Sequence, residues 1–317
     1  MILAGPFAAP MFMICMGIGI CYSRNQDWQS LVKRGVRIVF MGYVLNIVRY
    51  VLPQCITTFL TGESRYMANW VSKLCEVDIL QFAGLSFIAI GLARKFRLSN
   101  CLLTVIACIL SITGCILKDV NTGAAIPDLL LGLFWKTQEH AYFTFFHWFI
   151  FPVMGMILGD LLLRCRDKKK TYKKIIPVLL PIGVAAELTA IALGKGLLGD
   201  FTEYYYMTVV DVFFLVSLAI AWAGFLFLVY EKFPKGMIVA FQNMSKNINQ
   251  IYCIHWGMIG ILGIVRVFTW KDTVVSMLPM TMVSFAVLFI AAVIADGYQK
   301  WKRITYVQRG KGKAYGN

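Results

Sequence analysis

The sequence predicts an all-α membrane protein, a polytopic bundle of about nine transmembrane helices. Hydrophobic residues make up 59% of the 317 residues and the mean hydropathy is +0.70, whereas a soluble domain is about 45–50% apolar. Apolar windows of about 20 residues, the length that crosses a hydrocarbon core, recur along the chain. A transmembrane β-barrel would instead show short segments of alternating polarity.

Nine segments have the length of a membrane span. They cover 3–22, 36–54, 78–96, 101–117, 142–163, 175–194, 207–230, 249–268 and 274–297, and a short helix at 237–248 precedes the eighth. We expect one membrane domain over 1–303 and a basic cytoplasmic tail at 304–317. The polar segments between spans, the longest at 54–77 and 118–141, are too short for an independent soluble core. Any site therefore lies among the helices or at their ends.

The net charge of +15 fits the positive-inside bias and does not indicate nucleic acid binding. With residue 1 outside, the cytoplasmic segments hold 22 of the 31 basic residues and the outer segments hold seven. We therefore expect a multi-pass protein of the plasma membrane with its N-terminus outside and its C-terminus in the cytoplasm. The run RDKKKTYKK at 166–174 is expected to lie against anionic membrane lipid. An odd number of spans with an outer N-terminus also suggests that a preceding span is absent from this sequence.

The cysteines and small residues indicate packing more than chemistry. Cys55 and Cys75 both fall in the first outer loop, where a disulfide is one interpretation. The other cysteines lie in or beside spans and are interpreted as small packing residues. No CxxC or metal-ligand spacing occurs, so no metal is expected. The GMILG stretch at 155–159 predicts close helix packing.

Charged groups at membrane depth are costly, and each one is a candidate functional residue. Arg49 lies toward the outer end of the second span, where it either snorkels or pairs, or binds an anionic substrate. Glu187 and Asp211 are acids within spans that could pair with it.

The outer ends of the third and fifth spans carry further candidates. Asp78 and Gln81 open the third span, where an aspartate either caps the helix or belongs to a site. His147 lies about two turns, roughly 10 Å, below the outer surface. It is either a hydrogen-bonded structural imidazole or a general base.

Polar residues also crowd into the run MSKNINQIYCIHW at 244–256, at the expected cytoplasmic end of the eighth span. Ser245 is a candidate N-cap, and Asn249 shares a helix face with Tyr252 and Trp256. A helix N-terminus of this kind can receive a phosphate. Hydrogen bonding between helices without any ligand is the alternative.

Two arginines lie at the same expected cytoplasmic level. Arg34 and Arg37 are one helical turn apart where the second span begins, a spacing that suits a polyphosphate. Arginines at a cytoplasmic boundary are also what the topology demands. Together with the polar run they predict a cytosolic ligand that bears phosphate.

Five stretches, in this order, resemble membrane acyltransferases of the heparan-α-glucosaminide N-acetyltransferase-like and acyltransferase-3 families. They are FAAPMFMICMGIGICYSR (7–24), LVKRGVRIVFMGYVLN (31–46), VDILQFAGLSFIAIGL (77–92), WFIFPVMGMILGDLL (148–162) and MSKNINQIYCIHW (244–256). The resemblance covers roughly 7–298. It implies that an acyl group, usually acetyl, moves from cytosolic acyl-CoA to a hydroxyl or amine of a sugar or glycan on the outer face.

The resemblance also gives the candidate residues their expected roles. The phosphates of acetyl-CoA would be bound by Arg34, Arg37, Ser245, Asn247 and Asn249. The acceptor would approach near the substrate-binding candidates Arg49, Gln81 and Glu139, and the catalytic candidates are His147, Asp78 and His255. Self-association into a homo-oligomer is left open.

One departure from the family pattern concerns the catalytic base. These families usually begin with a span that carries Arg-Gly and a catalytic histidine, which this sequence does not show. We therefore expect a truncated N-terminus. In a complete chain, either His147 or His255 would act as the base, or the protein would not be an active transferase. The other hypotheses are a transporter or flippase without covalent chemistry, against which no internal repeat is found, and a structural or partner-binding membrane protein.

Overall fold

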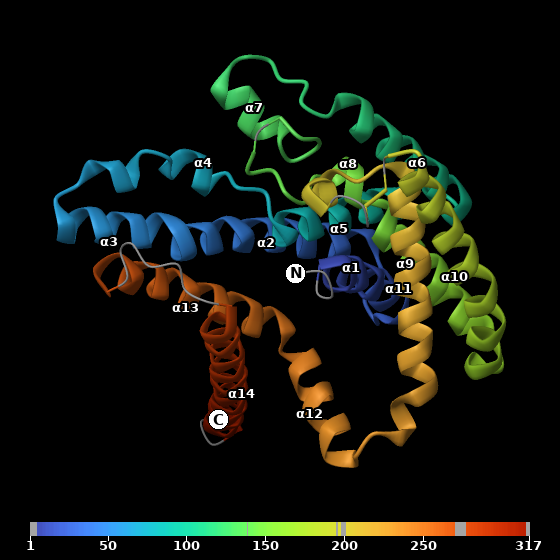
Figure 1. The fold of residues 1–317 in the computed structure, drawn as a ribbon. Coiled ribbons are helices and arrows are strands. Elements are labelled where there is room, and N and C mark those ends of the chain that lie inside the picture. Colours follow the sequence, from blue (N-terminus) through green and yellow to red (C-terminus); the bar gives the residue numbers. More distant parts are fainter. Residues whose placement is uncertain (1–4, 138, 195, 198–200, 270–276, 315–317) are drawn as a thin grey trace. The chain divides into compact units, whose positions relative to one another are not determined.

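The structure is a computed structural model that describes residues 5–137, 139–194, 196–197, 201–269 and 277–314. In these residues all regular secondary structure is helical, and turns and loops connect the helices. One isolated backbone bridge joins Val77 and Ala141. In the part of the chain that the structure describes, seven helices are long and apolar enough to cross a membrane. The predicted all-α, polytopic fold class is thereby confirmed (Figure 1).

The chain divides into two compact units, which are described separately. Unit 1 consists of Met1–Tyr43 and Cys75–Glu231, and unit 2 of Val44–Leu74 and Lys232–Asn317. Unit 1 contains α1 (Gly5–Tyr22), most of α2 (Trp28–Asn46), α5 (Ile79–Lys95), α6 (Asn100–Leu117), α7 (Ala125–Leu131), α8 (Phe145–Trp148), α9 (Ile150–Arg164), α10 (Lys168–Ala192), η3 (Phe201–Tyr206) and α11 (Val209–Val229). The short η4 (Tyr230–Lys232) leads from unit 1 into unit 2.

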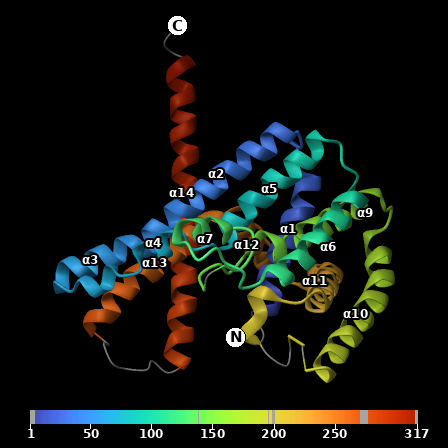
Figure 2. The ribbon, with the colours of Figure 1, turned by 90° about the horizontal axis from the view of Figure 1, so that it is seen from above.

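The core of unit 1 is built on the packing of α1 against α9, which lie side by side in both ribbon views (Figure 1, Figure 2). Glycines make this approach close. A Cβ added at Gly17 would collide with the carbonyl oxygen of Pro152, and one at Gly155 with that of Ile14. Gly155 belongs to the GMILG stretch, so its predicted role in close helix packing is confirmed.

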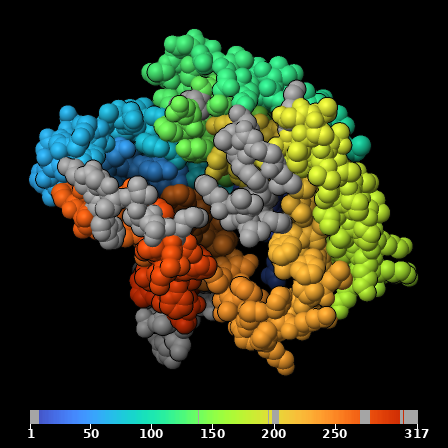
Figure 3. Space-filling model, in the orientation of Figure 1, coloured from blue at the N-terminus to red at the C-terminus, as the bar shows by residue number. Residues whose placement is uncertain are grey.

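Helices α10 and α11 form a second packed pair in unit 1. A Cβ at Gly183 would lie 2.7 Å from the Cβ of Ser217, so the two backbones approach closely there. Only 17% of the apolar window of α10 is buried, and apolar side chains of this helix such as Val178 and Leu188 are exposed. The yellow-green segment of Figure 3 that contains α10 lies at the surface. This pattern suits a lipid-facing helix, whose own backbone hydrogen bonds are satisfied internally.

Unit 2 contains η1 (Ile47–Val51), α3 (Leu52–Thr61), η2 (Ser64–Met67), α4 (Trp70–Leu74), α12 (Lys235–Lys246), α13 (Ile248–Thr269) and α14 (Met277–Ala314). Helix α13 packs against η1, α3 and α14 (Figure 2). η1 is a π-helical turn, in which the Leu52 N–H donates to the carbonyl of Ile47. Pro53 explains the wider turn, because it has no N–H to donate to the carbonyl four residues earlier.

The predicted spans fall on described helical segments, although residues 3–4 and 274–276 of two spans lie outside the described residues. The span 36–54 covers parts of α2, η1 and α3, and the span 142–163 covers α8 and most of α9. The expected short helix at 237–248 is present as α12. The prediction that the second span ends at residue 54 is wrong. Helical structure continues through α3 to Thr61, and Gly62 ends it with a φ of 72°. Proline is tolerated in the first turn of a helix, so Pro53 opens α3 and does not end the span.

Candidate functional site

Three short segments of unit 1 meet where α5 and α8 begin. We call residues 76–78, 140–148 and 204–206 the loop cluster. The Val77 N–H donates to the His140 carbonyl at 3.1 Å, and the Tyr142 N–H returns a bond to the Val77 carbonyl at 3.1 Å. The Trp148 Nε1–H donates to the Tyr205 carbonyl at 3.0 Å. These bonds hold segments together that are far apart in the sequence.

Aromatic rings and carboxylates share the loop cluster. The Tyr205 ring centroid lies 4.9 Å from that of Tyr142 and 5.3 Å from that of Phe143. Burial raises the pKa of the Tyr205 hydroxyl, and the nearby carboxylates of Asp78 and Glu76 raise it further. Glu76 is buried. Neither Glu76 nor Tyr205 was among the residues predicted from the sequence. The one sequence feature that could have indicated Glu76 is its position directly before Val77 and Asp78.

His147 is fully buried within the loop cluster, at 0% exposure. Its Nδ1 lies 2.9 Å from the hydroxyl oxygen of Thr144, and its ring centroid lies 6.0 Å from that of Tyr206. The backbone of α6 packs directly against the imidazole ring, because a Cβ added at Gly114 would lie only 2.9 Å from Nδ1 of His147. Within the described part of the chain, the buried Nε2 has no hydrogen-bond partner. An Nδ1–H that donates to Thr144 leaves the Nε2 lone pair available to accept a proton.

Asp78 and Gln81 form the N-terminal cap of α5. The Asp78 carboxylate accepts from the backbone N–H of Ile79 at 2.7 Å and from that of Gln81, and Gln81 Oε1 accepts from the Asp78 N–H at 3.2 Å. This reciprocal arrangement is a capping box. Gln81 is fully buried and its amide packs against Gly42 of α2. The capping interpretation of Asp78 is therefore realised in the structure.

The predicted ligands of the CoA phosphates belong to both units. Arg34 and Arg37 are exposed on α2 in unit 1, and the Arg34 guanidinium lies 4.4 Å from the Phe87 ring centroid. Ser245, Asn247 and Asn249 belong to unit 2. Glu139, a substrate-binding candidate, is exposed in the turn before the loop cluster.

The polar run 244–256 spans the junction of α12 and α13. Ser245 lies in the last turn of α12 and Asn247 is the C-cap of that helix. The prediction that Ser245 caps the eighth span is therefore wrong, because the helix continues through it and breaks two residues later. Asn249 is exposed in the first turn of α13. The predicted shared face is confirmed for Tyr252 and Trp256, whose ring centroids lie 6.3 Å apart.

His255 and Arg49 also lie in unit 2. The His255 Nδ1 lies 3.3 Å from the Ile251 carbonyl oxygen, and its ring centroid is 5.3 Å from that of Tyr252. Arg49 is 3% exposed in the π-helical turn. Its guanidinium carbon lies 4.7 Å from the Trp256 ring centroid. Snorkelling of Arg49 to solvent is ruled out by this burial.

The structure also shows the state of Cys55 and Cys75 and the contacts of Asp211. Cys55 and Cys75 are free thiols, so the disulfide considered for them is not formed in this structure. Asp211 caps its own helix: its carboxylate accepts from the Thr208 N–H and hydroxyl, both at 2.7 Å, and from the Leu197 N–H at 3.0 Å. Its carboxylate thus has a local structural role.

The fold and this arrangement define a polytopic membrane protein that holds a histidine and carboxylates among its helix ends. The family model described as "Heparan-alpha-glucosaminide N-acetyltransferase, catalytic" matches residues 1–187. The chain belongs to this family, which places it among membrane acetyltransferases. The matched region includes Arg34, Arg49 and the first two segments of the loop cluster, but not the run 244–256. Neither the curated proteins nor the solved structures contain a match.

Proposed function

We propose that this chain transfers an acetyl group from acetyl-CoA to a hydroxyl or amine of a sugar or glycan on the outer face of the plasma membrane. The observation that carries the proposal is the match of the catalytic family model to residues 1–187. The loop cluster in that region combines a buried histidine with carboxylates and aromatic rings, the mixture of apolar walls and few polar groups that small-molecule sites use. The charge distribution supports an outer N-terminus and a cytoplasmic C-terminus.

His147 is the proposed general base. Its Nε2 would take the proton of the acceptor hydroxyl or amine as that group attacks the thioester carbonyl. The C–S bond then breaks, and the CoA thiolate takes this proton back from the imidazolium to leave as the thiol. Thr144 positions the ring through Nδ1. Tyr142, Tyr205 and the exposed Glu139 are the proposed acceptor contacts. Asp78 and Gln81 act as positioning residues, because the cap that they form sets the start of α5 within the loop cluster.

The cytosolic donor site is proposed to use Arg34 and Arg37, whose guanidiniums match phosphate geometry. Ser245, Asn247 and Asn249 belong to unit 2 and stay separate predictions as residues that bind phosphate. The exposed lysines of the segment 166–174 would lie against anionic lipid.

The experiment uses the full chain in lipid nanodiscs, labelled acetyl-CoA, and a panel of amino sugars and neutral sugars. We expect label transfer by the wild type and a loss of at least a hundredfold in kcat for His147→Gln, the range expected for a general base. His140→Gln is the matched control, a second histidine of the loop cluster that is given no part in the reaction. Transfer by His147→Gln at the wild-type rate would remove His147 from the mechanism, and no transfer by the wild type to any acceptor would refute the proposed function.

A further inference from the structure

Unit 2 holds a cavity of about 310 Å³ that the proposed transfer reaction does not use. It lies between the η1–α3 segment and α13, and its volume is within the range of small-molecule sites. Pro53 and Ile264 belong to its apolar walls, and Gln54, Tyr66 and Trp256 bring polar groups to it. None of these residues belongs to the loop cluster, so the cavity is a separate site.

Two side chains of the cavity wall carry a polar atom that is shielded from solvent and has no hydrogen-bond partner among the described residues. These atoms are the indole Nε1 of Trp256, a donor, and the amide Oε1 of Gln54, an acceptor. Buried polar atoms are almost always hydrogen-bonded, and an unsatisfied one is costly. A bound molecule that offers an acceptor and a donor, such as an ester carbonyl and a hydroxyl, would satisfy both atoms.

The cavity does not require a charge from this molecule. Arg49 is the one charged side chain among the described residues that line it, and it has interactions of its own within the protein. Its guanidinium carbon lies 4.5 Å from the Tyr50 ring centroid and 4.7 Å from the Trp256 ring centroid. An uncharged head group with hydrogen-bonding oxygens therefore meets the needs of the polar wall.

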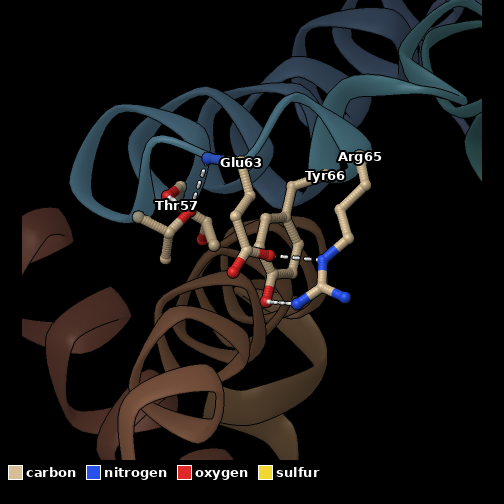
Figure 4. A network of polar contacts seen from close by, with 5 residues as sticks. Thr57, Glu63, Arg65 and Tyr66 are labelled. Atoms are coloured by element: carbon tan, nitrogen blue, oxygen red, sulfur yellow. Dashed lines mark hydrogen bonds and ion pairs between the residues drawn. The ribbon is translucent and has the colours of Figure 1, made fainter.

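Hydrogen bonds fix the part of the wall that follows from the end of α3 (Figure 4). The Thr61 hydroxyl donates to the Thr57 carbonyl at 2.7 Å, and the Glu63 N–H donates to the Thr61 hydroxyl oxygen at 3.3 Å. Arg65 forms an ion pair with Glu63, and its Nη2 donates to the Tyr66 hydroxyl oxygen at 3.5 Å. Because these bonds hold Thr57 and Tyr66 in place, this wall is formed before a ligand binds, as in most ligand sites.

The wall that α13 contributes is apolar and opens toward lipid. Ile259 and Gly263 line the cavity and are exposed, and only 11% of the apolar window of α13 is buried. A Cβ added at Gly263 would meet nothing within 4 Å, whereas one at Gly260 would lie 2.9 Å from the Arg49 carbonyl oxygen. The space beside Gly263 thus has room for a hydrocarbon chain, while α13 and η1 touch one turn away.

We propose that this cavity binds an uncharged membrane lipid with a hydroxyl in its head group, of the diacylglycerol type. The Trp256 indole N–H donates to an ester carbonyl, the lipid hydroxyl donates to Gln54 Oε1, and an acyl chain leaves the cavity beside Gly263. The proposal does not depend on acetyl transfer, because it uses none of the residues that are given a part in that reaction.

The test measures the lipids retained by the purified full chain in detergent, by native mass spectrometry. Dioleoylglycerol is compared with the methyl ether of its hydroxyl, which keeps the acceptors and lacks the donor, and with phosphatidylglycerol of the same chains. We expect the wild type to retain dioleoylglycerol at least fivefold better than the ether, the worth of about one hydrogen bond. Equal retention of these two lipids, retention of neither, or stronger retention of phosphatidylglycerol would overturn the proposal.

Two substitutions separate the polar contacts. Gln54→Leu should lower the retention of dioleoylglycerol about fivefold, to the level of the ether, and leave the ether unchanged. Trp256→Phe keeps a ring beside Arg49 and removes the N–H, so it should lower the retention of both lipids to a similar extent. An equal loss of both lipids in Gln54→Leu, or wild-type retention by Trp256→Phe, would overturn the proposal.

A third substitution tests the path of the acyl chain. Gly263→Leu, which fills the space beside α13, should lower the retention of both uncharged lipids at least tenfold. Gly297→Leu is the matched control, since a Cβ at Gly297 on α14 also meets nothing within 4 Å and does not line the cavity. Wild-type retention by Gly263→Leu would overturn the proposal. If Gly263→Leu lowers the melting temperature, the ratio of the two lipids in Gln54→Leu decides, because a general loss of stability does not change that ratio.

Discussion

Thr144 directs its hydroxyl to the imidazole of His147: the hydroxyl oxygen lies 2.9 Å from Nδ1. Thr144 is the N-cap residue of α8, yet its side chain makes no cap hydrogen bond. A threonine at this position ordinarily stabilises the free N–H groups of the first turn. The hydroxyl therefore lies where it can orient a fully buried ring, which is the arrangement that the proposed base requires.

This relationship predicts the effect of Thr144→Val, which preserves the shape of the side chain and removes the hydroxyl. If His147 is the base, the ring loses its orienting bond and kcat for acetyl transfer should fall about tenfold, corresponding to one hydrogen bond of about 1 kcal/mol or slightly more. KM for acetyl-CoA should stay constant, because the donor phosphates are bound elsewhere. Thr144→Ser, which restores the hydroxyl, should recover kcat. A rise in KM together with the fall in kcat, without rescue by serine, would indicate a purely structural role.

A second prediction concerns the packing of α1 on α9. Gly17→Ala should destabilise the protein by about 1–3 kcal/mol, because its Cβ would overlap the carbonyl of Pro152 and overpacking carries this cost. Gly19→Ala, two residues along the same helix, meets nothing within 4 Å and is the matched control. Thermal unfolding in detergent measures both. Equal melting temperatures for the two variants would show that the close approach of α1 and α9 does not exist.

A third prediction concerns pH and the start of α2. The Ser30 N–H donates to the Asp27 carboxylate at 2.8 Å, and this bond lowers the pKa of Asp27 from its usual 3.8. A carboxylate with a lowered folded-state pKa stabilises the fold above the unfolded value, and the contribution is lost as the pH falls through the folded-state pKa. The melting temperature of the wild type should therefore exceed that of Asp27→Ala at pH 7, and the difference should shrink below about pH 4. Asp27→Asn keeps a capping oxygen that does not titrate, so its difference from Asp27→Ala should persist in acid.

A fourth prediction tests the donor site. Arg34→Ala should raise KM for acetyl-CoA about tenfold with little change in kcat, because a phosphate contact that is equal in ground and transition states affects binding alone. Asn249→Ala should do the same to a lesser extent. Lys33→Ala, the adjacent exposed cation, is the control for a general change in surface charge. Unchanged KM in both Arg34→Ala and Asn249→Ala would refute the assignment of the cytosolic phosphate site.

Much of the secondary structure could be predicted, and the errors have local causes. The expected bounds of the fourth span, 101–117, nearly coincide with α6, because an uninterrupted apolar run leaves little ambiguity. The second span was misjudged at Pro53, because a proline that ends one helix and one that opens another look alike in sequence. Ser245 was misplaced for a similar reason: a serine before an apolar run resembles an N-cap whether or not a helix already precedes it.

The candidate site was less accessible to sequence reasoning. Asp78 and Gln81 are three residues apart, so their mutual cap could be foreseen. The approach of Glu76 to Tyr205 could not, because it depends on the segment before α5 meeting the turn before α11. Arg49 shows the same limit: its position in the sequence allowed snorkelling, whereas in the structure its side chain is buried and the Trp256 ring packs on the guanidinium.

The sequence by itself determined that this protein is a bundle of membrane-length helices related to an acetyltransferase family, because apolar run length and ordered motifs are properties of contiguous residues. Only the tertiary structure decided which polar side chains meet. It brought Glu76 close to Tyr205, placed α6 against His147, and opened a cavity beside Gly263. The physical reason is that helices within a membrane associate through the fit of side chains and backbone. That fit brings together residues that are far apart in the sequence, and no local sequence pattern indicates which of them will meet.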